Sequence, residues 1–129
     1  MKRYFPALLG LCLLLVGLTV CDSFRTLEYD ALTVYTDAGV AVYTPTETPP
    51  STRGRYVRAD LSGDPTETLA RLSAKELRRE ELDGVTVIYA FSPRIAAYET
   101  LSFGRVNVML AVRPDGRLAV GSPLLKGSY

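Results

Sequence analysis

The sequence contains no histidine and no tryptophan, and it has only two cysteines in 129 residues. The absence of histidine excludes a Ser-His-Asp triad, a Cys-His pair and an imidazole metal ligand. Cys12 lies inside an apolar leader, so removal of that leader would leave Cys21 as the one remaining cysteine. A single cysteine forms no intramolecular disulfide, even in an oxidising compartment. We therefore expect a core held by apolar burial, with no metal site and no cofactor.

The first twenty residues differ from the rest of the chain. Lys2 and Arg3 are followed by an almost purely apolar stretch at 7–20, which is the layout of a secretory signal. A run of about 14 residues is short for a bilayer span, which needs roughly 20. Of the 15 basic residues these two leave with the signal, whereas all 14 acidic residues lie beyond it. The residues after the signal therefore carry almost no net charge, so they lack the excess of basic side chains that is typical of nucleic-acid-binding proteins.

A short motif ends this leader. The segment Leu18-Thr19-Val20-Cys21 resembles the cleavage and lipidation motif of bacterial lipoproteins, with Val20 where a smaller residue is usual. The resemblance implies that the Cys21 sulfur takes a diacylglyceryl group and that the chain is cut before it. Long acyl chains then give stable anchoring in the bilayer. Asp22 resembles the signal for staying at the inner membrane, which implies the outer face of the cytoplasmic membrane.

Two alternatives to lipidation stay open, namely an uncleaved membrane anchor and free secretion after ordinary cleavage. In either case we expect a signal at 1–20, a membrane-proximal spacer at 21–30 and one domain at 31–129. Alternating apolar residues and turn residues predict the strands of this domain. They are expected at 31–36, 40–44, 55–61, 85–91, 105–113 and 117–122.

The strongest local signal predicts one helix. Asp64 is a capping residue, Pro65 suits the first helical position and Glu67 stands three residues after the cap. We expect the helix to run to about Leu82, although a second capping pattern makes a break near Ser73 an alternative. The order β-β-β-α-β-β-β predicts an α+β fold, with an antiparallel sheet of about six strands and one helix packed on one face.

Candidate functional residues are few. No catalytic group is expected, because the acidic residues near the end of the predicted helix are typical of a solvated face. Arginines and tyrosines in the third strand and in the 94–104 connection form a candidate partner surface. Its members are Arg53, Arg55, Tyr56, Arg58, Arg94 and Tyr98. The alternative interpretation is an edge strand protected by charge, with loop aromatics folded onto the core.

The composition and motifs together predict a non-catalytic extracytoplasmic domain anchored to the bilayer through acylated Cys21. Its expected partner is an envelope protein or a cell-wall component. The alternative function is a small domain for a soluble ligand, or a histidine-free enzyme that uses carboxylate and arginine groups. A closed pocket with two convergent carboxylates would favour the alternative, whereas a flat surface of tyrosines and arginines would favour the binding domain.

Overall fold

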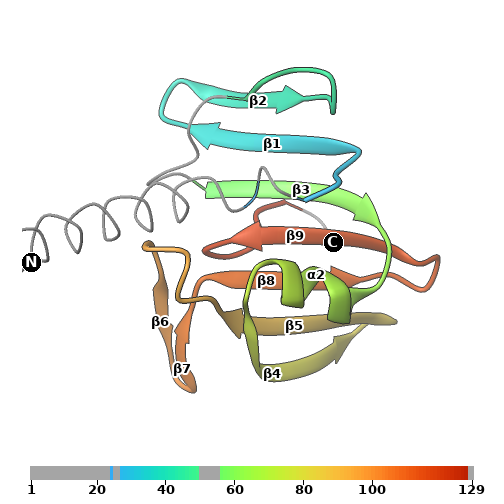
Figure 1. The fold of residues 1–129 in the computed structure, drawn as a ribbon. Coiled ribbons are helices and arrows are strands. Elements are labelled where there is room, and N and C mark those ends of the chain that lie inside the picture. The colour runs from blue at the N-terminus through green and yellow to red at the C-terminus, as the bar shows by residue number, and fades with distance from the viewer. Residues whose placement is uncertain (1–23, 25–26, 50–55, 128–129) are drawn as a thin grey trace, which may run out of the picture.

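The computed structural model describes Phe24, residues 27–49 and residues 56–127. Strands account for most of this part of the chain, and one short helix interrupts them (Figure 1). The elements are β1 (Ala31–Thr36), β2 (Gly39–Tyr43), β3 (Tyr56–Ser62), α2 (Pro65–Arg71), β4 (Lys75–Leu82), β5 (Val85–Phe91), β6 (Glu99–Leu101), β7 (Gly104–Val106), β8 (Val108–Val112) and β9 (Arg117–Ser122).

Seven of these strands form one antiparallel sheet in the order β2-β1-β3-β9-β8-β5-β4, and β6 and β7 pair separately. The last strand of the chain, β9, lies in the middle of the sheet between β3 and β8 (Figure 1). The prediction of an α+β fold with an antiparallel sheet and one helix is confirmed at this level. The strand count is higher than predicted and the strand order was not anticipated.

The predicted start of the helix is confirmed, its predicted end near Leu82 is wrong, and the alternative of a break near Ser73 is borne out. The Asp64 carboxylate accepts a hydrogen bond from the Thr66 amide at 2.9 Å, with Pro65 in the first turn. The helix stops at Arg71 because Ser73 adopts a left-handed conformation, with φ of 53°. The Ser73 amide donates to Ala70 O and the Ala74 amide donates to Leu69 O. These two hydrogen bonds together form the Schellman motif, which commonly ends helices.

The residues predicted as the second half of the helix form β4 instead. The strand pairs antiparallel with β5, with Arg79 opposite Ile88 and Glu80 opposite Val87. Its sequence KELRREEL has good helix formers, so local preference alone favours a helix. Pairing with the edge of β5 outweighs this preference, because the ladder satisfies backbone groups of both strands and places residues 75–82 in the sheet. Tertiary pairing therefore overrides helix propensity here.

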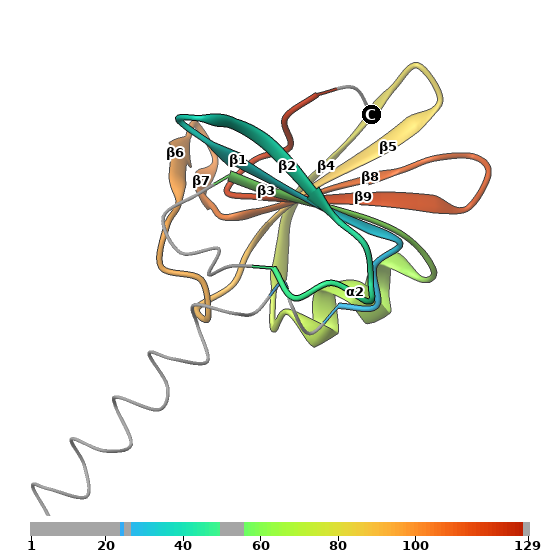
Figure 2. The ribbon, with the colours of Figure 1, turned by 90° about the horizontal axis from the view of Figure 1, so that it is seen from above.

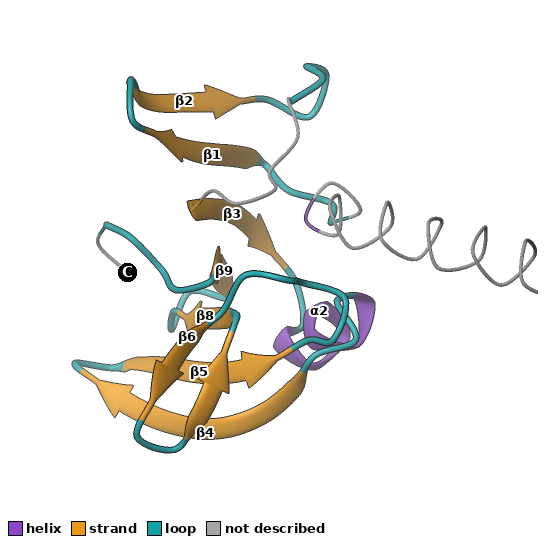
Figure 3. Cartoon of the chain, turned by 90° about the vertical axis from the view of Figure 1, so that its left-hand side faces the viewer, coloured by secondary structure: helices purple, strands orange, loops and turns teal. Residues whose placement is uncertain are grey.

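The connection after β5 also holds structure that was not predicted. Within it, β6 and β7 form a hairpin beside β5, as Figure 3 shows from the side. The strand predicted at 105–113 is divided into β7 and β8 at Asn107, whose side chain is fully buried. This division lets β7 leave the main sheet while β8 continues in it.

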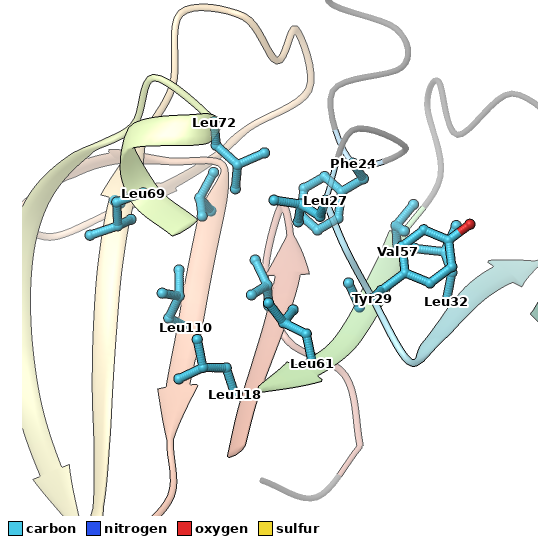
Figure 4. Packing of buried hydrophobic residues seen from close by; sticks show 14 of the residues in the cluster. Phe24, Leu27, Tyr29, Leu32, Val57, Leu61, Leu69, Leu72, Leu110 and Leu118 are labelled. Carbon is cyan, nitrogen blue, oxygen red and sulfur yellow. The ribbon is translucent and has the colours of Figure 1, made fainter. Parts of the chain in front are cut away.

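The main core lies between the sheet and α2. Leu69 of α2 and Leu72 at its C-cap cover the β5–β8 side, facing Leu110 (Figure 4). The rest of this face is covered by the segment before β1, which contributes three buried aromatic and aliphatic side chains to the same cluster: Phe24, Leu27 and Tyr29. These three residues fall in the range predicted as a spacer, and their burial makes them part of the core.

The C-terminal tail, residues 123–127, lies on part of the opposite face of the sheet. Figure 2 shows the end of the described chain on the far side of the sheet from α2. The tail lies so close to β9 that a Cβ added at Gly121 would come within 2.7 Å of the Leu125 Cα. The Leu125 amide also donates to the Met109 sulfur at 3.4 Å. Glycine at 121 is therefore what allows the tail to pack on the sheet.

Candidate binding surface

The tail-covered face carries a polar and aromatic region over β1 and β3. Tyr35 and Tyr56 are direct register partners, and Arg58 lies opposite Gly121 on β9. Residues that alternate along a strand share a face, which places Tyr56 and Arg58 on the side of Gly121 and the tail. We call Tyr35, Tyr56, Arg58, Glu99 and Lys126 the tyrosine–cation cluster.

Lys126 holds the tail on this cluster. Its ammonium nitrogen lies 4.2 Å from the ring centroid of Tyr56 and 5.7 Å from that of Tyr35. Its carbonyl oxygen accepts a hydrogen bond from the Arg58 guanidinium at 3.1 Å and from the Tyr35 hydroxyl at 3.4 Å. Cation–π contacts of this kind contribute about 0.5–1 kcal/mol at exposed sites. The tail is thus fixed by both its backbone and its side chain.

Tyr56 joins the sheet to the β6–β7 hairpin. Its hydroxyl donates a hydrogen bond to the Glu99 carboxylate at 2.8 Å. This bond, with smaller contributions from desolvation and from the negative charge of Glu99, raises the pKa of Tyr56 above its ordinary value of 10.0. The hydroxyl therefore stays protonated as a donor, and the cluster connects residues that lie far apart in the sequence.

Arg58 is a largely enclosed charged group, with a side chain only 11% exposed. Its Nε and Nη2 atoms each lie 3.2 Å from Asp60 Oδ1 on the same strand. The Asp60 carboxylate compensates the charge of the guanidinium, which would be costly to bury alone. Arg58 is thus a rigid support for Lys126 and the tail, and the exposed cation of the cluster is Lys126.

The structure brings together only part of the predicted partner surface. Tyr56 and Arg58 lie in the cluster, whereas Arg94 lies on the helix side, with Nη1 at 3.5 Å from Arg71 O. Tyr98 packs separately, with the Arg105 guanidinium 4.8 Å from its ring centroid. The other predicted members, Arg53 and Arg55, lie outside the described residues, as does Cys21.

Three members of the cluster were missed from the sequence. Tyr35 carries a usable signal, because it alternates with the apolar residues of the predicted hairpin and so faces away from the core. Glu99 and Lys126 carry none, since each reaches the cluster only after a loop or the tail folds across the sheet. Local patterns do not contain that information.

The enzymatic alternative requires a pocket with two convergent carboxylates. A shallow depression lies between the start of α2 and the end of β3, with Leu27, Leu61 and Asp64 in its lining. Its acidic groups are solvated, as Glu28 and Glu67 are 87% and 62% exposed, and both pair with Arg71. Asp64 is already used as the helix cap. This depression therefore lacks two buried, convergent carboxylates.

The part of the chain that the structure describes also bears on membrane spans and metal sites. No helix in it is both long and apolar enough to span a bilayer. No group of three or more acidic or cysteine side chains among these residues has the arrangement of a metal site. No protein family, curated protein or solved structure shows significant similarity to the chain, so these comparisons assign it to no family.

Proposed function

We propose that this protein is a non-catalytic binding domain, held at the outer face of the bacterial cytoplasmic membrane by a lipid on Cys21. It engages an envelope protein or a cell-wall component through the tyrosine–cation cluster. The observation that carries the proposal is the assembly of Tyr35, Tyr56 and Lys126 on one side of the sheet. The charge of the neighbouring Arg58 is already balanced by Asp60.

The chemistry of the cluster supports a partner with hydrogen-bonding and acidic groups. Tyrosine is enriched among the residues that dominate binding energy, because it buries a large area at a small loss of side-chain entropy. The ammonium group of Lys126 is exposed and is oriented by the two rings beneath it. A carboxylate of a partner can meet this cation while its apolar parts contact the tyrosine rings.

The location rests on the segment LTVC at 18–21, which resembles the lipoprotein motif. Wild type and Cys21→Ser are expressed in a bacterium that is fed labelled palmitate, and membrane and soluble fractions are separated. We expect label on the wild type alone, and loss of membrane retention in Cys21→Ser. Equal retention of both proteins without label would indicate an uncleaved anchor and contradict the lipid.

The binding surface is tested by photocrosslinking in intact cells. A photoreactive phenylalanine analogue replaces Tyr35 in one version and Leu82, at the distant β4 edge, in the other. We expect a discrete crosslinked product at position 35 that is absent at position 82. Lys126→Glu in the same chain should abolish that product, because it reverses the exposed charge. Similar products from both positions, or no effect of Lys126→Glu, would refute the proposed surface.

A further inference from the structure

The two edges of the seven-stranded sheet differ in chemistry. All residues of β4 except Leu77 and Leu82 are charged, which is how exposed edge strands resist pairing with other chains. The other edge, β2, reads GVAVY and carries no charge. Val40 and Val42 are 62% and 59% exposed, the largest fractions among the large apolar side chains of the described residues. The β2 edge thus lacks the protection that β4 has.

We infer that β2 pairs with β2 of a second copy of this chain, antiparallel and about a two-fold axis through Ala41. An isologous interface requires a surface that is complementary to itself. The strand meets this requirement because Val40 and Val42 are placed symmetrically around Ala41. Two-fold pairing sets each Val40 opposite Val42 of the second copy, so the four valines pack side by side on one face of the joined sheet.

The backbone of β2 is suited to this pairing. In an antiparallel ladder, successive residues direct their N–H and C=O groups alternately to one neighbour and to the other side. Among the residues that the structure describes, β2 pairs with β1 alone, with Val34 opposite Ala41. Alternate residues of β2 therefore present hydrogen-bonding groups at the edge, and a second β2 satisfies them in both chains at once.

The residues flanking β2 place no like charges together in this register. Asp37 falls opposite Pro45 of the second copy, and the residues between them are uncharged. Beyond the strand, the Glu47 carboxylate is turned back to Thr44, accepting from its amide at 3.2 Å and from its hydroxyl at 2.9 Å. A second β4 would instead meet a row of charged side chains. Self-pairing is therefore favoured at β2 and opposed at β4.

Disulfide trapping tests the register. In the full-length chain Ala41→Cys places two thiols directly opposite each other, where Cα atoms lie about 4.5–5.5 Å apart and a disulfide can close. Thr44→Cys lies opposite Ala38 in the same register, and Leu82→Cys lies at the β4 edge, so both are matched controls. The wild-type chain shows how much covalent dimer its native Cys12 and Cys21 form on their own. We expect a covalent dimer from Ala41→Cys well above all three controls. No excess at Ala41→Cys would overturn the register.

Sedimentation of the detergent-solubilised full chain tests the dimer itself. We expect wild type to sediment as a dimer, Val42→Lys as a monomer and Leu82→Lys as a dimer. Circular dichroism checks that Val42→Lys stays folded, and if it does not, the disulfide result decides. A monomeric wild type, or a folded Val42→Lys that remains a dimer, would refute the inference. Lys126→Glu should leave the dimer intact, because this edge does not depend on the proposed partner surface.

Discussion

The side chain of Asn107 and the backbone of Ser92 exchange two hydrogen bonds, each 2.7 Å long. The Asn107 amide also donates to Ile95 O at 2.8 Å. Both residues are fully buried, and the Ser92 hydroxyl donates to Leu72 O and accepts from the Arg94 amide. The network joins the end of α2, the end of β5 and the junction of β7 with β8. Its polar groups are satisfied, so it orders this region without an unpaired buried group.

Replacing Asn107 should be strongly destabilising. Asn107→Ala leaves the Ser92 amide and the carbonyls of Ser92 and Ile95 without their side-chain partner in a buried site. We expect a loss of roughly 2–4 kcal/mol in the free energy of unfolding, measured by urea denaturation. Ser92→Ala is the control, because it removes only the hydroxyl and should cost about 1–2 kcal/mol. Equal small losses in both variants would contradict a central role for the amide.

Replacing Ser73 by glycine should increase the stability of the folded protein. The residue has a left-handed backbone at the end of α2, where a Cβ is unfavourable and glycine is preferred. We expect Ser73→Gly to raise the free energy of unfolding by about 0.5–1 kcal/mol, since part of the relief is offset by the greater freedom of the unfolded chain. Ser62→Gly, at the end of β3, should instead lower it. A loss of stability in Ser73→Gly would argue against the Schellman motif.

Gly121 should tolerate no side chain while the tail is in place. A Cβ there meets the Leu125 Cα at 2.7 Å and the Leu124 carbonyl oxygen at 2.8 Å, both backbone atoms. We expect Gly121→Ala to cost about 1–3 kcal/mol, as other overpacked sites do. The same substitution in a chain that ends at Ser122 should cost much less. Equal costs in the two backgrounds would show that the tail is not the cause.

The hydrogen bond between Tyr56 and Glu99 predicts a pH dependence of stability. The pKa of Tyr56 is raised in the folded protein, mainly by this bond, so the folded state retains the phenolic proton to a higher pH than the unfolded state. The stabilisation is fully present below pH 10.0 and is lost as the pH rises through the folded pKa. The measurement is the difference in unfolding free energy between wild type and Tyr56→Phe, followed from neutral to alkaline pH.

The matched control for this prediction is Glu99→Gln, which keeps an acceptor oxygen but removes the negative charge. In that background the alkaline loss assigned to Tyr56 should be smaller, because the coulombic contribution of Glu99 to the raised pKa is gone. A difference between wild type and Tyr56→Phe that does not change with pH would contradict the role of this bond.

Local chemistry was sufficient to predict several elements. The strand at 85–91, the hairpin turn before Gly39 and the start of the helix at Asp64 all lie where predicted. Each depends on residues close in sequence: apolar alternation, a glycine at a turn, or a cap and proline at a helix start. The lipid proposed on Cys21 is likewise predicted from the sequence, and Cys21 lies outside the described residues.

Tertiary structure decided the rest. Residues 75–82 prefer a helix locally and form a strand because they pair with the edge of β5. Phe24, Leu27 and Tyr29 join the core because the sheet is wider than α2 can cover. Lys126 meets Tyr35 and Tyr56 only because the tail crosses Gly121. In every case the deciding partner is distant in sequence, so hydrogen bonding and burial across the sheet determine what local preference could not.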